Sequence, residues 1–531
     1  MGTRGKSFWI LSSISLLLVG LFSLSLTGAA EAVLANLKLS GELAVGGDVK
    51  SFEISPDGRF AVFLADARTN TVDELFSVPT TGGDRTPLSH DLGTGMLVQG
   101  FVISPDSHSV VYWTADAEGL CTGIYGVPIT GGTPVDVSVT IPAYKKIGIM
   151  AVSPDSQYAV YTLHHQEYEV DSFEVLWAAP LTGGGAIALT QETDDYYSID
   201  FQLTPSGNEV VYRQTPFTGP SFLSKANMQG ARENLAGPYG SIADFTITAD
   251  GDRVLFTAPV TVYLKNELFS VPIEGGSPVQ LNGTMDDDRT VLDFELAPNS
   301  QMAVYRADEL VDEQFELFSV PVDGSTERVR LLSTMTPNGD VEQYQITPNS
   351  LGVVYMADQL ADERFDLGAV DIYGGTAFWL NKEMAAGGDV TNFAITPNSL
   401  GVVFTADKFV DETFELFSVS IIGTSLSRLS ADMPAGGDVL DFAIAPNSQG
   451  VVYRADQAVD EVFGLYAVPS VGGIPPVRLN TPLTTGGDVH AYVITPDNRG
   501  VLYLADQETD GVDELFASID RQAVYLPLAM R

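Results

Sequence analysis

The chain has 531 residues, of which 45% are hydrophobic, with 51 Gly, 29 Pro and a formal net charge of −42. This composition is typical of a globular protein with many turns, and it excludes the disordered and collagen-like classes. Because 69 acidic residues outnumber 27 Lys and Arg, we expect no nucleic-acid partner.

The N-terminal segment has the features of an export signal. Arg4 and Lys6 precede a long apolar run, which ends in Ala30-Glu31-Ala32, a small-x-small cleavage pattern. An uncleaved membrane anchor is the alternative, because the run approaches the ~20 residues that span a bilayer. We expect residues 1–32 to be a signal peptide, and residues 33–531 to be exported (secreted, periplasmic or at the cell surface) without a membrane span.

A turn sequence recurs along the rest of the chain. Its copies are SPDG at 55, SPDS at 104 and 153, TPSG at 204, TADG at 248, APNS at 297, TPNS at 347 and 396, APNS at 445 and TPDN at 495. Pro fixes φ, and Asn, Asp or Gly tolerates the left-handed region, so these are turns with a physical basis. A period of about 49 residues predicts ten stacked supersecondary units, close in length to propeller repeats.

Each unit predicts four strands. The strand before the turn alternates, as in Phe52 and Ile54, which is typical of a strand with one buried side. The third strand is ELFSVP in the best copies, and the fourth is short, as in VRLN at 477–480. The second strand carries an aromatic residue at one place in all ten units: Phe63, Tyr112, Tyr161, Tyr212, Phe256, Tyr305, Tyr355, Phe404, Tyr453 and Tyr503. We interpret this stripe as core and not as a platform for carbohydrate stacking.

Four short strands bury both faces only when sheets pack radially. The sequence therefore predicts an all-β fold, a β-propeller of ten four-stranded antiparallel blades. Residues 38–49, KLSGELAVGGDV, align with 478–489, RLNTPLTTGGDV, so the N-terminus offers a spare fourth strand for the last unit. The segment AVYLPL near the C-terminus is another candidate for that strand. We expect one closed ring; two smaller rings are the alternative.

The repeat pattern F-x-I-[ST]-P-[DN]-[GS]-x-x-V-[VAL]-[YF]-x-A-D, followed by E-L-[FY]-x-V-[PS], resembles the WD40-like repeat of the TolB family of exported propellers. The resemblance extends from about Leu37 to the C-terminus and implies a TolB-like propeller over 33–531. The chain departs from TolB in having more units and no preceding α/β domain, so the resemblance does not imply docking to a peptidoglycan-associated lipoprotein.

Aspartates recur in the two loops that should share one face of such a propeller. We predict that they form a rim that binds a partner or cations. Its members are Asp66, Asp308, Asp358, Asp407, Asp456 and Asp506 at the end of the second strand, Asp312, Asp362, Asp411 and Asp460 further along that loop, and Asp48, Asp340, Asp389, Asp438 and Asp488 before the first strand. Units 3 to 5 instead carry Lys145, Lys146, His164, His165, Arg213 and Lys265 at comparable places.

Loop carboxylates suit Ca²⁺, but the D-x-x-x-D-E spacing is not that of an EF-hand. A solvated rim and carboxylates that cap loop backbone are the alternatives, so we assign no metal site and expect no cofactor.

Catalytic signatures are sparse. Cys121 is the single cysteine, and neither G-x-S-x-G nor HExxH occurs. The histidines of most interest are the pair His164-His165 and His490. A pair of carboxylates that acts in glycoside hydrolysis is not excluded by the sequence, because Asp and Glu are abundant. We expect a non-catalytic platform that binds a protein or an extracellular polymer through its acidic face. A carbohydrate-active enzyme, a polysaccharide lyase or glycoside hydrolase acting at the central channel, is the alternative.

Overall fold

The computed structural model describes residues 34–93, 95–139, 141, 145–165, 174–190, 196–216, 219–260, 265–333, 335–361 and 363–520. Over these residues the chain forms forty strands in ten four-stranded antiparallel sheets and no helix. The expected signal peptide lies outside the described residues. No helix long and apolar enough to cross a membrane occurs in the described part of the chain.

Each sheet is one blade, whose strands we call a to d from the centre of the ring outward. The a strands are β2 (Val49–Ile54), β6 (Leu97–Ile103), β10 (Lys145–Val152), β14 (Tyr196–Leu203), β18 (Asp244–Ile247), β22 (Val291–Leu296), β26 (Val341–Ile346), β30 (Val390–Ile395), β34 (Val439–Ile444) and β38 (Val489–Ile494). The b strands are β3 (Phe60–Ala65), β7 (Ser109–Ala115), β11 (Tyr158–His165), β15 (Glu209–Pro216), β19 (Arg253–Pro259), β23 (Met302–Ala307), β27 (Gly352–Ala357), β31 (Gly401–Ala406), β35 (Gly450–Ala455) and β39 (Gly500–Ala505).

The outer two strands follow the same order. The c strands are β4 (Glu74–Pro79), β8 (Cys121–Pro128), β12 (Glu174–Pro180), β16 (Ser221–Asn227), β20 (Asn266–Pro272), β24 (Glu316–Pro321), β28 (Asp366–Asp371), β32 (Glu415–Ser420), β36 (Gly464–Pro469) and β40 (Glu514–Asp520). The d strands are β5 (Thr86–Pro87), β9 (Val135–Asp136), β13 (Ile187–Ala188), β17 (Arg232–Tyr239), β21 (Val279–Gln280), β25 (Val329–Arg330), β29 (Phe378–Trp379), β33 (Ser427–Arg428), β37 (Val477–Arg478) and, for the last blade, β1 (Leu34–Lys38).

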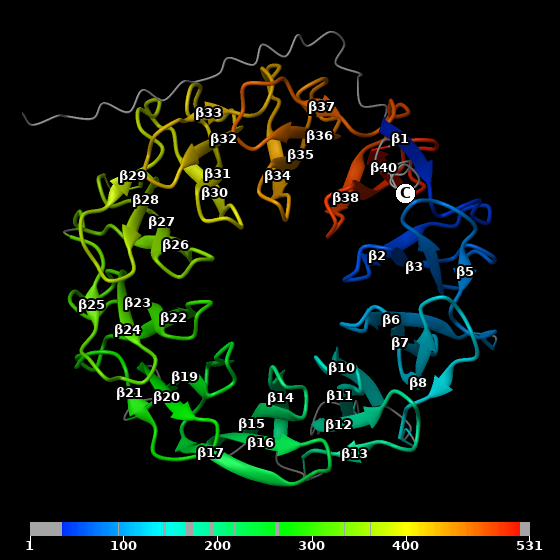
Figure 1. Cartoon of the computed structure of the whole chain (residues 1–531), viewed down its shortest axis with the longest axis horizontal. Coiled ribbons are helices and arrows are strands. Elements are labelled where there is room, and N and C mark those ends of the chain that lie inside the picture. The colour runs from blue at the N-terminus through cyan, green and yellow to red at the C-terminus, as the bar shows by residue number, and fades with distance from the viewer. Residues whose placement is uncertain are drawn as a thin grey trace, which may run out of the picture.

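The ten blades form a single ring, so the prediction of one ring is confirmed and two smaller rings are excluded (Figure 1). We number them from blade 1, which begins with β2, to blade 10, which begins with β38. The ring closes through β1, which pairs antiparallel with β40, with Leu34 opposite Asp520 and Lys38 opposite Phe516. The N-terminus thus supplies the fourth strand of blade 10, as the sequence match predicted. The rival segment AVYLPL lies outside the described residues.

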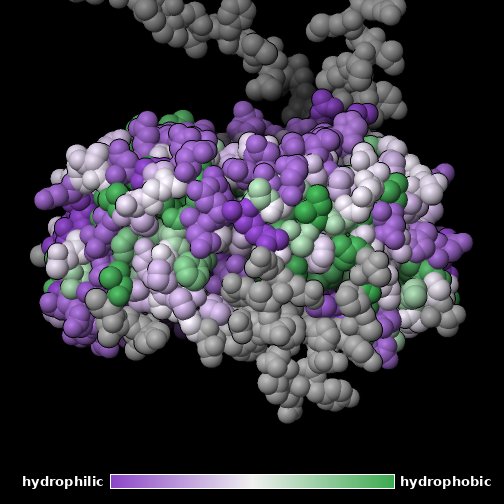
Figure 2. Space-filling view, turned by 90° about the horizontal axis from the view of Figure 1, so that it is seen from below, coloured by the Kyte–Doolittle hydropathy of each residue, from purple (hydrophilic) through white to green (hydrophobic). Residues whose placement is uncertain are grey.

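The core lies between neighbouring blades. Val62 and Leu75 of blade 1, for example, pack with Val110 and Val127 of blade 2. The ten aromatic residues of the b strands are all at most 2% exposed, which confirms their interpretation as core. Most stack on an aromatic residue of strand c, as Tyr305 does on Phe318 with ring centroids 5.4 Å apart. Seen edge-on in Figure 2, the ring is wider than it is tall, and its hydrophobic residues form separate patches among hydrophilic ones.

Candidate functional site

Two kinds of connection share each face of the ring. The b–c and d–a connections lie on one face, which we call the loop face, and the a–b and c–d turns lie on the other, the turn face. All the aspartates of the predicted rim belong to loops of the loop face or border them. Asp362 is the only one of them outside the described residues.

The aspartates at the ends of the b strands are buried, although we expected them on an exposed rim. Asp66, Asp308, Asp358, Asp407, Asp456 and Asp506 are 2–5% exposed. Their carboxylates accept backbone N–H groups from two loops: Oδ1 of Asp407 accepts from Asp389 at 2.5 Å, and Oδ2 accepts from Glu412 at 3.0 Å. Each of the other five makes the equivalent pair of bonds. These carboxylates fix the two loops of one blade together, because loop N–H groups without a partner would be costly to bury.

Burial and hydrogen bonding act in opposite directions on the pKa of Asp66. For Asp66 the backbone N–H groups of Asp48 and Thr71, together with the charge of Lys50, outweigh burial and lower the pKa. The ionised carboxylate is therefore the form of Asp66 to which the two loops of blade 1 donate their hydrogen bonds.

A second set of aspartates connects neighbouring blades. Asp48, Asp340, Asp389, Asp438 and Asp488, before the a strands, are half-buried. Four of them accept the backbone N–H of a phenylalanine in the preceding blade at 2.6–2.7 Å, and Asp48 accepts that of Asp513 at 3.2 Å across the ring closure. Burial raises the pKa of Asp340, Asp389 and Asp438, and the adjacent buried aspartate of the same blade adds to this.

The third set is exposed. Asp312, Asp411 and Asp460 lie at the outermost part of the b–c loops of blades 6, 8 and 9. The next residue is a glutamate with φ between 55° and 62°, namely Glu313, Glu363, Glu412 or Glu461 in blades 6 to 9. The N–H of that glutamate is the donor to the buried aspartate five residues earlier. The buried carboxylate therefore holds the loop in the left-handed turn that points the two acids outward.

Apolar side chains, which we did not predict as part of the site, lie beside these exposed acids. Leu310, Val311, Leu360, Phe409, Val410 and Val459 are 43–60% exposed. Together with Asp312, Glu313, Glu363, Asp411, Glu412, Asp460 and Glu461 they form a set on four successive blades that we call the tip arc. The sequence contains a feature that predicts these exposed residues. An apolar residue recurs directly before the acids, in a loop where burial in a strand does not account for it. Exposed apolar residues that gather in a patch rimmed by polar residues mark interaction surfaces.

The basic residues of units 3 to 5 serve local structure. Arg213 lies 3.3 Å from Asp200 and donates to the carbonyl of Ile242 in the next blade. Lys265 is buried, donates to the carbonyl of Met285 at 2.8 Å and lies 3.3 Å from Glu267. Lys145 is buried as well, and Lys146 is half-buried.

The histidines do not converge. His164 is half-buried on β11 of blade 3, where burial lowers its pKa, and the side chain of His165 lies outside the described residues. His490 is on β38 of blade 10, its Nδ1 2.6 Å from Oδ1 of Asp513, so blades 1 and 2 separate it from His164. Cys121 is buried, and burial raises its pKa to about 12. Among the described residues, no three His, Cys, Asp or Glu side chains meet in a group that could hold a metal ion.

Comparison with known proteins assigns neither a family nor an activity to the chain. No known family profile and no curated protein matches the chain. Solved structures that resemble it include a eukaryotic initiation factor (12% identity, 76% of this chain and 94% of that chain, TM-score 0.48) and an oligogalacturonate lyase in complex with manganese (13%, 64% and 95%, TM-score 0.35). A putative TolB from Agrobacterium tumefaciens is also similar (17%, 47% and 85%, TM-score 0.27). At these identities and TM-scores the likeness does not transfer the activity of any of these proteins to this chain.

Proposed function

We propose that the chain is an exported, TolB-like, non-catalytic propeller that binds a basic protein partner through the tip arc. The observation that carries the proposal is the recurrence, on blades 6 to 9, of exposed apolar side chains directly beside exposed acids. An apolar contact supplies affinity, and acids around it orient a partner of opposite charge.

The construction of the arc supports a binding role. Each tip is held by a buried aspartate, and each blade is bonded to the next through the half-buried aspartates before the a strands. The four tips are therefore presented in fixed positions, so a partner that spans two of them gains avidity without ordering the loops. Extracellular polymers with cationic groups fit the same surface less well, because they lack apolar side chains to cover Phe409 and Val410.

The proposal is tested with two variants of equal charge change. The tip variant carries Asp312→Asn, Asp411→Asn and Asp460→Asn; the control carries Asp84→Asn, Glu274→Gln and Glu327→Gln, three exposed acids in c–d turns of the turn face. Each immobilised chain is used to capture proteins from the secreted and surface fractions of the source cells, at low and at physiological salt.

We expect a basic protein to be retained by the wild type and the control, and to be lost from the tip variant by at least about tenfold. Retention should fall with rising salt, because exposed charges are screened. Equal loss from both variants would mean that only net charge matters and would overturn the assignment to the tip arc. Capture that is unaffected by either variant would overturn the charge-based mode altogether.

A further inference from the structure

Two side chains fill the space between neighbouring blades near the turn face. One directly follows strand c: Ile129, Val322 and Ile372 each join a core cluster that includes residues of the preceding blade. The other is the first residue of strand b: Phe60 packs against the cluster between blades 1 and 2, and Met302 belongs to the one between blades 6 and 7. Together they close the gap that two twisted sheets leave at this depth.

Neither of these two positions carries an apolar residue between blades 9 and 10. Strand β35 begins with Gly450, and the register of β40 places Asp520 where other blades have the residue after strand c. A Cβ atom at Gly450 would meet its nearest neighbours, Val468 O and Ala445 Cβ, at 3.8–3.9 Å, which is ordinary van der Waals contact, so a larger side chain could begin there without a clash. The result is an open cavity of about 690 Å³ between the two blades.

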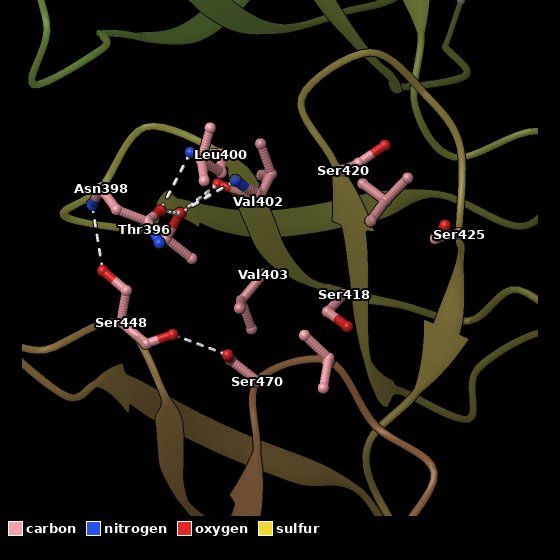
Figure 3. A pocket seen from close by; sticks show the side chains of 13 residues that line it. Thr396, Asn398, Leu400, Val402, Val403, Ser418, Ser420, Ser425, Ser448 and Ser470 are labelled. Atoms are coloured by element: carbon pink, nitrogen blue, oxygen red, sulfur yellow. Dashed lines mark hydrogen bonds between the residues drawn. The ribbon is translucent and has the colours of Figure 1, made fainter. Parts of the chain in front are cut away.

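The neighbouring interface supports this account of the cavity. Between blades 8 and 9 the same two positions hold the small residues Gly401 and Ser470. A smaller cavity of about 230 Å³ remains there (Figure 3). The hydroxyl of Ser470 donates to the carbonyl of Ser448 in its own blade at 2.7 Å, so this side chain does not replace an apolar filler.

The larger cavity is lined mostly by apolar side chains and by a few polar ones. Val468 and Leu479 of blade 9 face Ile494 and Val501 of blade 10 across it. Oγ of Ser518, a residue 2% exposed, lines it and has no hydrogen-bond partner among the described residues.

Arg499 is the one charged residue among those that line this cavity. Its side chain is 67% exposed, and its Nε lies 3.6 Å from the Asp497 carboxylate, so the guanidinium has donors left for another acceptor. A cation that lines an apolar cavity favours a ligand with an anionic head group.

We propose that the cavity between blades 9 and 10 binds a small anionic amphiphile of the fatty-acid class. The acyl chain lies between the two blades, the carboxylate meets Arg499, and the hydroxyl of Ser518 gains a hydrogen-bond partner. The volume and the mostly apolar lining with few polar groups are those of small-molecule sites. This site is separate from the tip arc, since it opens near the turns and not the loops, and it does not depend on the proposed function.

The test uses dodecanoate as the probe and dodecanol as its uncharged counterpart, with binding to the full chain followed by isothermal titration calorimetry. Gly450→Met fills the cavity with the residue that blade 6 has at this place; Ala467→Leu is a second filling variant. Ser470→Ile, which fills only the smaller cavity, is the matched control. Arg499→Gln removes the cation and leaves the cavity open.

We expect the wild type and Ser470→Ile to bind dodecanoate equally, and both filling variants to lose at least about tenfold in affinity while folding normally. Arg499→Gln should weaken the affinity for dodecanoate several-fold and leave the affinity for dodecanol unchanged. No binding by the wild type, or binding that Gly450→Met and Ala467→Leu leave intact, would overturn the proposal. A dimer that dissociates in the filling variants would assign the cavity to a second copy of the chain and would also overturn it.

Discussion

Aspartates in similar sequence contexts have different structural roles in this protein, and the role of each follows from whether its side chain is buried or exposed. Asp407 is 3% exposed and accepts two loop N–H groups, whereas Asp411, four residues later, is exposed. The sequence shows that both are acidic and repeated but does not show which one is enclosed by loop backbone. The capping alternative describes the buried set, and the binding of a partner or cations by the rim stays a prediction.

Asp407→Asn should destabilise the protein by about 1–3 kcal/mol, because each carboxylate oxygen accepts one N–H group and the amide replaces one of these oxygens with an NH₂ donor. Asp411→Asn should change stability by less than about 0.5 kcal/mol, since this side chain is exposed. Chemical denaturation of both variants measures the difference. Equal effects would contradict the division between buried and exposed aspartates.

Glu295, on strand a of blade 6, gives a pH dependence with a definite sign. Burial raises its pKa to about 7 in the folded state, although its Oε2 accepts the N–H of Ile346 in the next blade at 3.0 Å. A raised carboxyl pKa means that the folded state holds the proton longer than the unfolded chain. The stability it contributes is present below pH 4.5 and is lost as the pH rises toward 7.

Glu295→Gln should therefore stabilise the protein at pH 8 by about 1–2 kcal/mol, after allowance for partial exposure, and much less at pH 5. Glutamine already occupies this place in blade 7, where Gln345 bonds to Phe393 of the next blade. Unfolding midpoints at the two pH values are the measurement. A variant that is less stable at pH 8 than the wild type would contradict the prediction.

At the scale of the element, sequence periodicity predicted the strands, because alternation, turn residues and the aromatic of strand b are local features. The closing strand was also predictable, since residues 38–49 copy the loop that follows strand d elsewhere. The two inter-blade cavities were not, because Gly450 and the position of Asp520 become neighbours only when the blades are packed. The same holds for the tip arc, because the exposure of its apolar residues, which recur about 49 residues apart in the chain, follows from how the b–c loops fold.

The closing strand should contribute as much stability as an internal one. Leu39, which follows β1, is 1% exposed and packs between blades 10 and 1, and Leu479 occupies the equivalent place in blade 9. Leu39→Ala should cost about 2–5 kcal/mol, as should Leu479→Ala. The free energy of unfolding of the two variants is the measurement; a Leu39→Ala variant as stable as the wild type would show that the N-terminus does not close the ring.

At the scale of the whole molecule, the closed ring is what fixes the arrangement of the loop face. Hydrogen bonds between the half-buried aspartates and the preceding blade recur in blades 7 to 10 and across the closure from blade 10 to blade 1. A ring connected in this way presents blades 6 to 9 in one fixed arc, and an open ring would let the tips move apart.

The most direct test of this account is cryo-electron microscopy of residues 33–531 in solution, with class averages viewed along the ring axis. We predict one closed ring of ten radial blades with density continuous between blades 10 and 1. Two smaller rings, or a ring with a gap at that junction, would contradict the closed ring from which the arrangement of the tip arc was derived.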